Sequence, residues 1–317
     1  MTRRILVTRR IHLDTDIGGD TDDLCALAML LGWPDVELVG VTTCSDSGGL
    51  RAGLARYALR LAGQEGVPVV AGADGSLGGY RVLPGFSDPG RYWPEPVGPE
   101  PSPAGAALDL LERSVEMGAT VVGVGPWTNL ALLEAARPGL LASTQLVVLG
   151  GYVRSIGAGL PAWKPDTDYN VQQDTLAARI VWERCDPLIV QFSVALEVRL
   201  REAHLSQLRE GGALARLIAR QGELHGADSG MRRVGREHPG LPDDLLNFQY
   251  DPLACAAAAG WEGVQVEELQ LSARLKDGVL TFPESPGGKP TRVVTGVDGP
   301  RLEREWVEAV SAVGSVG

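Results

Sequence analysis

Short apolar runs alternate with longer amphipathic stretches along most of the chain. Most of the short runs are rich in β-branched residues, as is typical of strands that a sheet buries on both faces. The predicted strands are 11–16, 36–43, 67–73, 119–125, 145–151 and 187–194. The predicted helices between and around them are 22–32, 50–63, 128–137 and 175–185. This alternation predicts an α/β fold with an open, mostly parallel, Rossmann-like sheet and helices on both of its faces.

The remaining segments carry other patterns. Residues 197–221 are predicted to be helical, and a polar segment follows at 222–247. After it come a loop entering a helix at 250–260, a small C-terminal β-hairpin at 264–282 and a last helix at 300–313. The hairpin is expected to turn at Asp277-Gly278. Gly and Pro crowd residues 74–103, and long loops of this kind are usually functional. Because neither a linker nor an internal repeat interrupts the pattern, residues 1–317 are predicted to form one domain.

Composition narrows the class of protein. The formal charge is −11, from 29 basic and 40 acidic residues. This balance argues against nucleic-acid binding, which needs a basic footprint, and against an anionic membrane surface. The N-terminal stretch has no apolar core of a signal peptide, and no run is long enough to cross a membrane. The four cysteines are far apart and lie in apolar contexts, which predicts buried free thiols and a cytoplasmic location.

The stretch "HLDTDIGGDTDDLCALAMLL" concentrates negative charge where a predicted strand ends and a helix begins. Five of the ten residues from Asp14 to Asp23 are aspartates. A helix cap with solvated acids accounts for Asp20 and Asp22, but poorly for Asp14 and Asp16. Uncompensated carboxylates at such spacing are costly, and their oxygens suit a hard divalent cation. Since ligands of such sheets bind beyond the carboxyl ends of the strands, we expect a metal site here.

Two other aspartate-rich motifs, the EF-hand loop and the D-x-D phosphatase motif, fit this stretch less well. An EF-hand loop that started at Asp14 would need an acid at its fifth position, where the chain has Gly18. A D-x-D phosphatase that uses magnesium also opens with two aspartates after a strand. This phosphatase reading stays open as an alternative, although the chain lacks the short Gly-Thr-apolar turn that follows the motif in those enzymes.

The acidic stretch resembles the signature of the nucleoside hydrolases, the inosine–uridine-preferring N-ribohydrolase family. That signature is a strand, then D-x-D-P-G-x-D-D, then an apolar helix. Here Ile17 replaces the proline and the stretch before the acidic pair is two residues longer. The similarity continues in order along the chain through "VELVGVTT", "VVGVGPWTNLAL", "LVVLGGY", "DTDYNVQQDTLAA" and "YDPLACA". These segments together are far more specific than a single D-x-D.

The resemblance implies calcium-dependent hydrolysis of the N-glycosidic bond of ribonucleosides, giving ribose and free base. The implied calcium ligands are Asp16, Asp23, the Val124 carbonyl and Asp251. The implied general base is Asp22, although the longer loop leaves the assignment among Asp20, Asp22 and Asp23 open. The implied ribose contacts are Asp168, Asn170 and, after the second strand, Ser47 or Asp46. Trp163 and Trp93 are candidates to stack on the base.

The chain also departs from the family pattern. Tyr250 stands where many members carry a histidine that protonates the leaving base, and a phenol is a weak acid at neutral pH. His225 and His238 lie in the polar segment, which is a candidate wall of the pocket. A non-catalytic, metal-dependent ribosyl-binding protein therefore stays open as a second alternative. The resemblance further implies a homodimer or homotetramer, and it does not determine which base is preferred.

Overall fold

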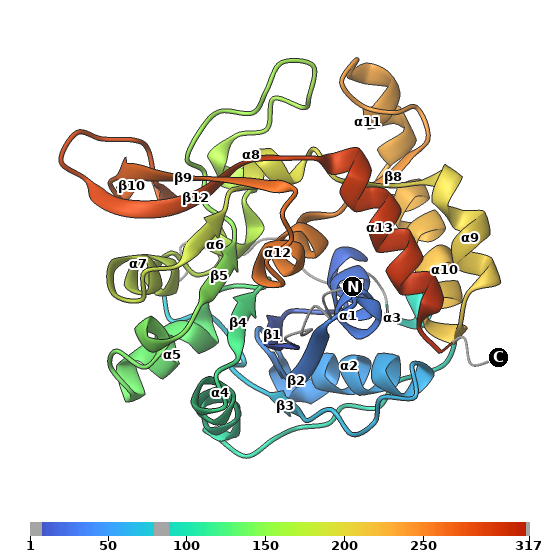
Figure 1. Cartoon of the computed structure of the whole chain (residues 1–317), viewed down its shortest axis with the longest axis horizontal. Helices are drawn as coiled ribbons and strands as arrows, with labels where there is room; N and C mark the ends of the chain where they lie inside the picture. Colours follow the sequence, from blue (N-terminus) through green and yellow to red (C-terminus); the bar gives the residue numbers. More distant parts are fainter. Residues whose placement is uncertain (1–7, 79–88, 315–317) are drawn as a thin grey trace, which may run out of the picture.

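The computed structural model describes residues 8–78 and 89–314, and one large sheet runs through its centre (Figure 1). Within the described residues this sheet has eight strands, and every neighbouring pair is parallel except the last. In spatial order the strands are β3 (Val69–Ala71), β2 (Val36–Thr43), β1 (Arg9–Thr15), β4 (Thr120–Gly123), β5 (Leu146–Leu149), β6 (Leu188–Val190), β12 (Lys289–Val297) and β9 (Val264–Leu271). The predicted α/β fold with a mostly parallel sheet is confirmed.

Helices cover both faces of this sheet (Figure 1). One face carries α1 (Asp22–Gly32), α2 (Leu50–Leu61), α10 (Ala213–Asp228), α12 (Tyr250–Ala258) and α13 (Gly299–Ala312). The other face carries α4 (Ala106–Glu116), α5 (Thr128–Ala136) and α7 (Thr175–Arg184). Each helix layer buries its own hydrophobic cluster against the sheet, as expected for strands that are apolar on both faces.

Helix α1 lies in the middle of one layer, and all but its last two residues are buried. It packs against α12 and α13, and Trp306 of α13 donates its indole N–H to the Cys25 carbonyl at 3.1 Å. A Cβ at Gly32 would lie 2.0 Å from the Ala309 carbonyl oxygen, so the end of α1 approaches α13 as closely as only glycine allows. This packing fixes the first turn of α1 relative to the sheet.

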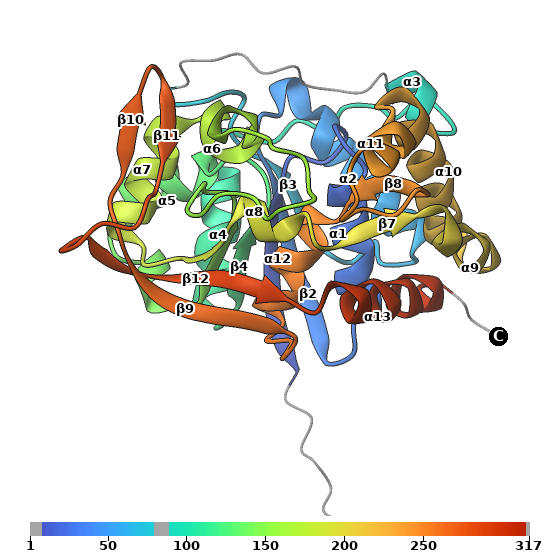
Figure 2. The ribbon, with the colours of Figure 1, turned by 90° about the horizontal axis from the view of Figure 1, so that it is seen from above.

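The prediction of a hairpin over residues 264–282 was wrong about the partner of its first strand. β9 pairs antiparallel with β12, a strand that the sequence pattern did not predict. The actual hairpin is smaller and joins β10 (Arg274–Lys276) to β11 (Val279–Thr281) through the expected turn, where Asp277 and Gly278 both have positive φ. Figure 2 shows β9 and β12 running side by side, and β12 leads directly into α13.

The predicted helical stretch over 197–221 was also wrong at its start. It opens with β7 (Arg199–Arg201), which pairs antiparallel with β8 (Leu245–Phe248), and two glycines then separate α9 (Leu205–Glu210) from α10. A short apolar–polar alternation such as Arg-Leu-Arg fits a strand as well as the end of a helix. The pairing of these residues with β8 determines that they form a strand. The polar segment after residue 221 contains the end of α10, α11 (Met231–Glu237) and β8.

The sequence pattern did not predict α4. The described elements that have not been named so far are short. They are α3 (Pro89–Tyr92), α6 (Tyr169–Gln173), α8 (Phe192–Ala195) and four 3-10 turns, Ser47–Gly49, Leu141–Ser143, Pro165–Thr167 and Glu202–His204. Residues 79–88 of the Gly- and Pro-rich loop lie outside the described residues. All four cysteines are buried and unpaired. Among the helices of the described residues, none combines the length and hydropathy that a membrane crossing requires. The single domain stays a prediction.

A buried polar chain crosses the sheet beneath the carboxyl end of β1. His12 lies between Ser114 and Thr42, with Nδ1···Oγ 2.8 Å and Nε2···Oγ1 3.0 Å. The Thr42 hydroxyl in turn donates to Asp14 at 2.5 Å, and the Ser114 hydroxyl donates to the Leu110 carbonyl at 3.0 Å, so the chain links α4 to β1 and β2. Burial lowers the pKa of His12 to about 3, since a charged imidazolium would lose its hydration.

This low pKa predicts acid sensitivity. The folded pKa lies below the unfolded one, so stability from His12 is complete above the unfolded value and is lost as the pH falls toward about 3. Between pH 7 and pH 4 the wild type should lose about 3 kcal/mol more unfolding free energy than His12→Gln. Urea unfolding of both proteins across this range measures the difference. Parallel pH profiles would show that His12 is not the titrating group.

Candidate active site

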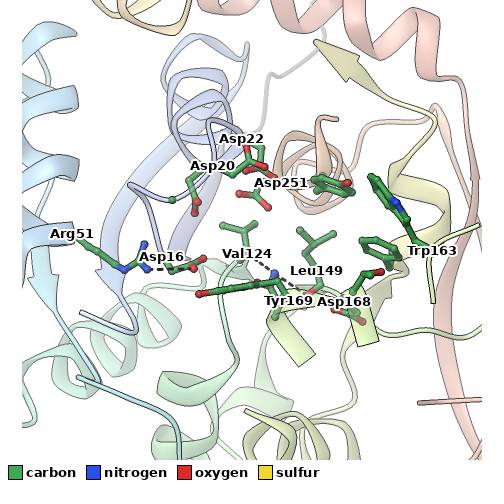
Figure 3. A pocket seen from close by; sticks show the side chains of 17 residues that line it. Asp16, Asp20, Asp22, Arg51, Val124, Leu149, Trp163, Asp168, Tyr169 and Asp251 are labelled. Carbon is green, nitrogen blue, oxygen red and sulfur yellow. Dashed lines mark hydrogen bonds and ion pairs between the residues drawn. The ribbon is translucent and has the colours of Figure 1, made fainter. Parts of the chain in front are cut away.

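A cavity of about 460 Å³ opens at the carboxyl ends of β1, β4 and β5 (Figure 3). The first turns of α1, α6 and α12 face into it, so side chains from distant parts of the sequence meet there. The lining residues are Asp16, Gly19, Asp20, Asp22, Asp23, Arg51, Val124, Leu149, Gly150, Trp163, Thr167, Asp168, Tyr169, Asn170, Phe192, Tyr250 and Asp251. This is the edge where parallel α/β sheets place ligands.

Three carboxylates converge on one wall of the cavity. Asp22 and Asp23 lie in the first turn of α1, and Asp251 lies in the first turn of α12, which packs beside it. One oxygen from each lies within 4.8 Å of the others, and all three residues are buried. Desolvation first, and then the neighbouring carboxylates, raise the pKa of each well above its usual value. Such a group of hard oxygen ligands could bind a metal ion.

Asp16 lies beside these three carboxylates and faces a cation that the sequence analysis missed. Arg51, in the first turn of α2, is 2% exposed, and its Nη2 lies 3.8 Å from Oδ2 of Asp16. The same guanidinium donates to the Ser45 carbonyl at 3.0 Å and to the Ile17 carbonyl at 3.0 Å. In an amphipathic helix an arginine ordinarily faces solvent, so the sequence pattern carried no signal of this position.

The loop after β4 passes close to Asp16. A Cβ at Gly125 would lie 2.8 Å from Oδ1 of Asp16, so the absence of a side chain lets the Val124 backbone reach the carboxylates. The Val124 carbonyl accepts a hydrogen bond from the Asn170 amide at 2.5 Å. The predicted carbonyl ligand and the predicted sugar contact therefore lie side by side.

Asp168 and Asn170 stand at the start of α6, on the cavity floor. Asp168 accepts hydrogen bonds from the Gly151 N–H at 2.6 Å and the Val171 N–H at 3.4 Å, which fixes its carboxylate. Its burial raises its pKa to about 6. Tyr169, between them, also lines the cavity, and its phenol points toward Asp16 (Figure 3). The motif that predicted Asp168 and Asn170 gave no separate signal for Tyr169.

Aromatic side chains form the wall opposite Arg51 (Figure 3). The rings of Phe192 and Tyr250 are stacked, with centroids 5.7 Å apart, and Trp163 lies 6.1 Å from Phe192. Desolvation and the charges of three nearby aspartates raise the pKa of Tyr250 well above its usual value, so its phenol keeps its proton. Trp93, the other stacking candidate, is instead buried against Tyr57 outside the cavity lining.

Ser47 does not lie in this cavity. It is exposed in the 3-10 turn that follows β2, and it is not among the lining residues. Asp46 is buried, but its carboxylate accepts from the Arg51 and Ala52 N–H groups at 2.8 and 3.0 Å and so holds the start of α2. The expected sugar contact from this loop therefore has no geometric support, because the loop's acid is used for helix capping.

The longer loop before α1 brings Asp20 into the lining without adding it to the three converging carboxylates. Oδ2 of Asp20 lies 3.7 Å from Nε2 of His225 on α10. The structure thus groups Asp22 and Asp23 with Asp251 and leaves Asp20 apart. His238 lies outside the lining and hydrogen-bonds the Val234 carbonyl at 2.8 Å.

This geometry defines a class of protein: an α/β enzyme with a buried carboxylate site at the carboxyl edge of a mostly parallel sheet. The family model described as "Inosine-uridine preferring nucleoside hydrolase" matches residues 11–304. The chain belongs to this family and is a hydrolase acting on N-glycosyl bonds. The phosphatase and non-catalytic alternatives are accordingly not supported.

Named relatives fit this assignment. The chain is 28% identical over 221 residues to the pyrimidine-specific ribonucleoside hydrolase RihA of Salmonella paratyphi C, which covers 66% of this chain and 68% of the relative. The plant nucleoside hydrolase PpNRh1 has the same fold, with a TM-score of 0.76 at 22% identity over 96% of this chain and 99% of that one. A purine-preferring ribonucleoside hydrolase from Gardnerella vaginalis gives a TM-score of 0.75 at 23% identity, covering 96% and 98%.

The buried pair of Arg51 and Asp16 predicts a stability effect. Arg51→Met should lower the unfolding free energy by about 3 kcal/mol, because it leaves a buried carboxylate without its cation and two carbonyls without their donor. Chemical denaturation in a chelating buffer measures this. Arg60→Met, on the exposed side of the same helix, is the matched control and should change stability little. Equal effects of the two variants would contradict the assignment.

Proposed function

We propose that this enzyme hydrolyses the N-glycosidic bond of ribonucleosides in a calcium-dependent reaction, releasing ribose and free base. The observation that carries the proposal is the convergence of Asp22, Asp23 and Asp251 in one cavity with Asp168 and Asn170. Carboxylates suit a divalent cation, and a buried carboxylate and amide suit sugar hydroxyls. The relatives are named for pyrimidine and for purine nucleosides, so the preferred base stays open.

The donor set fits a calcium ion. The ligands we propose are Asp16, Asp23, the Val124 carbonyl and Asp251, all in the cavity lining. Their oxygens are hard donors, and burial raises the pKa of the three carboxylates, although Arg51 offsets part of this rise at Asp16 and Asp23. When bound, such an ion would make a coordinated water more acidic and would orient the vicinal hydroxyls of the sugar.

The chain's own groups supply the remaining chemistry. Asp168 and Asn170 hold the ribose through hydrogen bonds to its hydroxyls, and the aromatic wall with Trp163 contacts the base. Asp22, the first of the acidic pair, takes the proton of the attacking water as general base. Its raised pKa, caused by burial and by neighbouring carboxylates, makes it more basic than an exposed aspartate. Tyr250 donates a hydrogen bond near the leaving group.

Hydrolysis at C1′ of the ribose passes through an oxocarbenium-like sugar, as at other glycosides. The C1′–N bond breaks and leaves its electron pair on the base, while the water oxygen bonds to C1′. The concentration of carboxylates around the sugar favours the positive charge that develops there. A homodimer or homotetramer and a cytoplasmic location stay predictions.

Ribose release tests the function directly. Purified protein incubated separately with inosine, guanosine, adenosine, uridine and cytidine should release reducing sugar from at least one nucleoside. Prior treatment with a chelator should abolish the release, and calcium added back should restore it. Release that persists unchanged after chelation would contradict the calcium requirement. Absence of release from all five nucleosides would contradict the proposed substrate class.

Two aspartate variants separate the base from the ligands. Asp22→Asn should lower kcat by about 10²- to 10⁴-fold, because the general base is lost, while calcium binding measured by calorimetry is largely kept. Asp251→Ala should lose both turnover and calcium binding. Asp109→Asn, an exposed acid in the first turn of α4, serves as the control. A near wild-type rate for Asp22→Asn would refute the base assignment.

A further inference from the structure

The β10–β11 hairpin has no role in the reaction as described so far, yet it lies against the segment that carries two proposed sugar contacts. Its strand β11 contacts both α6 and the 3-10 turn Pro165–Thr167 (Figure 2). Residues 165–170, here called the sugar-contact segment, bring Asp168 and Asn170 into the cavity lining. Neither strand of the hairpin is among the described residues that line the cavity.

Gln172 joins this hairpin to α6. The residue belongs to α6 and is 0% exposed. Its carboxamide donates to the Leu280 carbonyl at 2.8 Å and accepts from the Leu280 N–H at 2.9 Å, as the backbone of a neighbouring strand would. The same amide nitrogen donates to the Pro165 carbonyl at 3.2 Å. Only this orientation of the carboxamide satisfies all three contacts, so one side chain ties together α6, β11 and the start of the sugar-contact segment.

The end of β11 is anchored beneath the cavity floor. Phe282, the next residue, is 0% exposed, and its N–H donates to the Tyr152 carbonyl at 3.1 Å. Tyr152 directly follows Gly151, whose N–H donates to the Asp168 carboxylate at 2.6 Å. The Phe282 ring stacks on Trp127 with centroids 6.3 Å apart, and the Trp127 indole N–H donates to the last carbonyl of β5 at 3.0 Å. The hairpin is therefore supported by the central sheet.

These contacts close a ring of residues through Asp168. Its carboxylate is held by the loop after β5, and its backbone carbonyl accepts from the Gln172 N–H at 3.1 Å. The Asp168 N–H donates to the Pro165 carbonyl at 3.3 Å, which is the carbonyl that the Gln172 carboxamide also contacts. The ring continues through Leu280 and Phe282 back to the loop after β5. Asp168 is thus fixed from both ends.

We propose that Gln172 is a positioning residue that fixes Asp168 for its contact with the sugar. This inference rests on the proposed function, in which Asp168 binds the ribose. Gln172 lies outside the cavity lining and acts only through the backbone groups that it contacts. The hairpin is the fixed support, because β11 is anchored at the end of β5 and Gln172 holds α6 against it.

The expected effect is on turnover more than on binding. A shift of about 1 Å in a group that positions the substrate can lower the rate by about 10²-fold. The other proposed contacts lie on other elements, with the converging carboxylates on α1 and α12 and the aromatic wall at Phe192 and Tyr250. Loss of Gln172 leaves those surfaces in place, so the nucleoside still binds but its C1′ is held less precisely.

Replacement of the carboxamide tests this inference. Gln172→Met keeps the length of the side chain and removes all three hydrogen bonds. It should lower kcat for the preferred nucleoside by about tenfold or more and change KM by less than about threefold. Calorimetry should show a calcium affinity within about twofold of the wild type, because the proposed ligands lie on other elements. Gln207→Met, at an exposed position of α9, is the matched control and should change none of these values.

A double variant tests whether Gln172 acts through Asp168. Asp168→Ala removes the carboxylate that the ring positions, so adding Gln172→Met to it should lower kcat by less than about threefold further. Gln172→Asn, whose carboxamide is one methylene shorter, keeps a polar group at this position and should lower kcat in the same way as Gln172→Met. Circular dichroism melts show that each variant is folded at the assay temperature.

The outcomes separate this inference from the proposed function. If the wild type releases ribose and folded Gln172→Met or Gln172→Asn keeps kcat within about threefold, the positioning role is wrong and the function stands. A loss that recurs in full on the Asp168→Ala background would indicate a general structural role and would also overturn it. A tenfold loss of calcium affinity would do the same. If the wild type cleaves no nucleoside, the proposed function itself fails.

Discussion

Repulsion among buried carboxylates governs the architecture of this site. Asp16, Asp22, Asp23 and Asp251 are all buried at one edge of the sheet, where Coulomb interactions are poorly screened. The structure offsets part of this charge with one guanidinium, that of Arg51, and with the N-terminal ends of α1 and α12. The remainder keeps the pKa values of the carboxyl groups high, and a group of buried carboxylates of this kind could hold a metal ion.

The mostly parallel sheet is what makes such a concentration possible. Parallel strands end at a common edge, so residues after β1, β4 and β5 meet although they are far apart in the chain. Helices packed side by side then start at the same place, and α1 and α12 contribute their first-turn acids to one point. The buried chain of His12, Thr42 and Asp14 lies directly beneath and fixes the end of β1.

Two departures from the family pattern lie in the cavity lining, at Asp20 and at Tyr250. The two extra residues before the acidic pair place Asp20 at the opening, close to His225. Tyr250 replaces a histidine and joins the aromatic wall with Phe192. On the floor, Asp168 accepts from the Gly151 N–H, and the Asn170 amide donates to the Val124 carbonyl.

The sequence by itself determined the elements whose patterns are local, and the residues that a motif ties to the end of an element. The apolar run of α1, the β-branched run of β2 and the turn at Asp277-Gly278 were predictable because their apolar period or turn chemistry is complete within a few residues. The motifs also predicted that five residues share one site, because each follows a strand or opens a helix. These residues, which all line the cavity, are Asp16, Asp23, Asp168, Asn170 and Asp251.

Only the tertiary structure decided which partners lie across the chain. β12 inserts between β6 and β9, and β7 pairs with β8, through hydrogen bonds between residues distant in sequence. The packing of helices and loops buries Arg51 against Asp16 and brings His225 close to Asp20. The same packing leaves Ser47 outside the cavity. Periodicity reports which face a residue occupies, but the neighbour on that face depends on how the elements assemble.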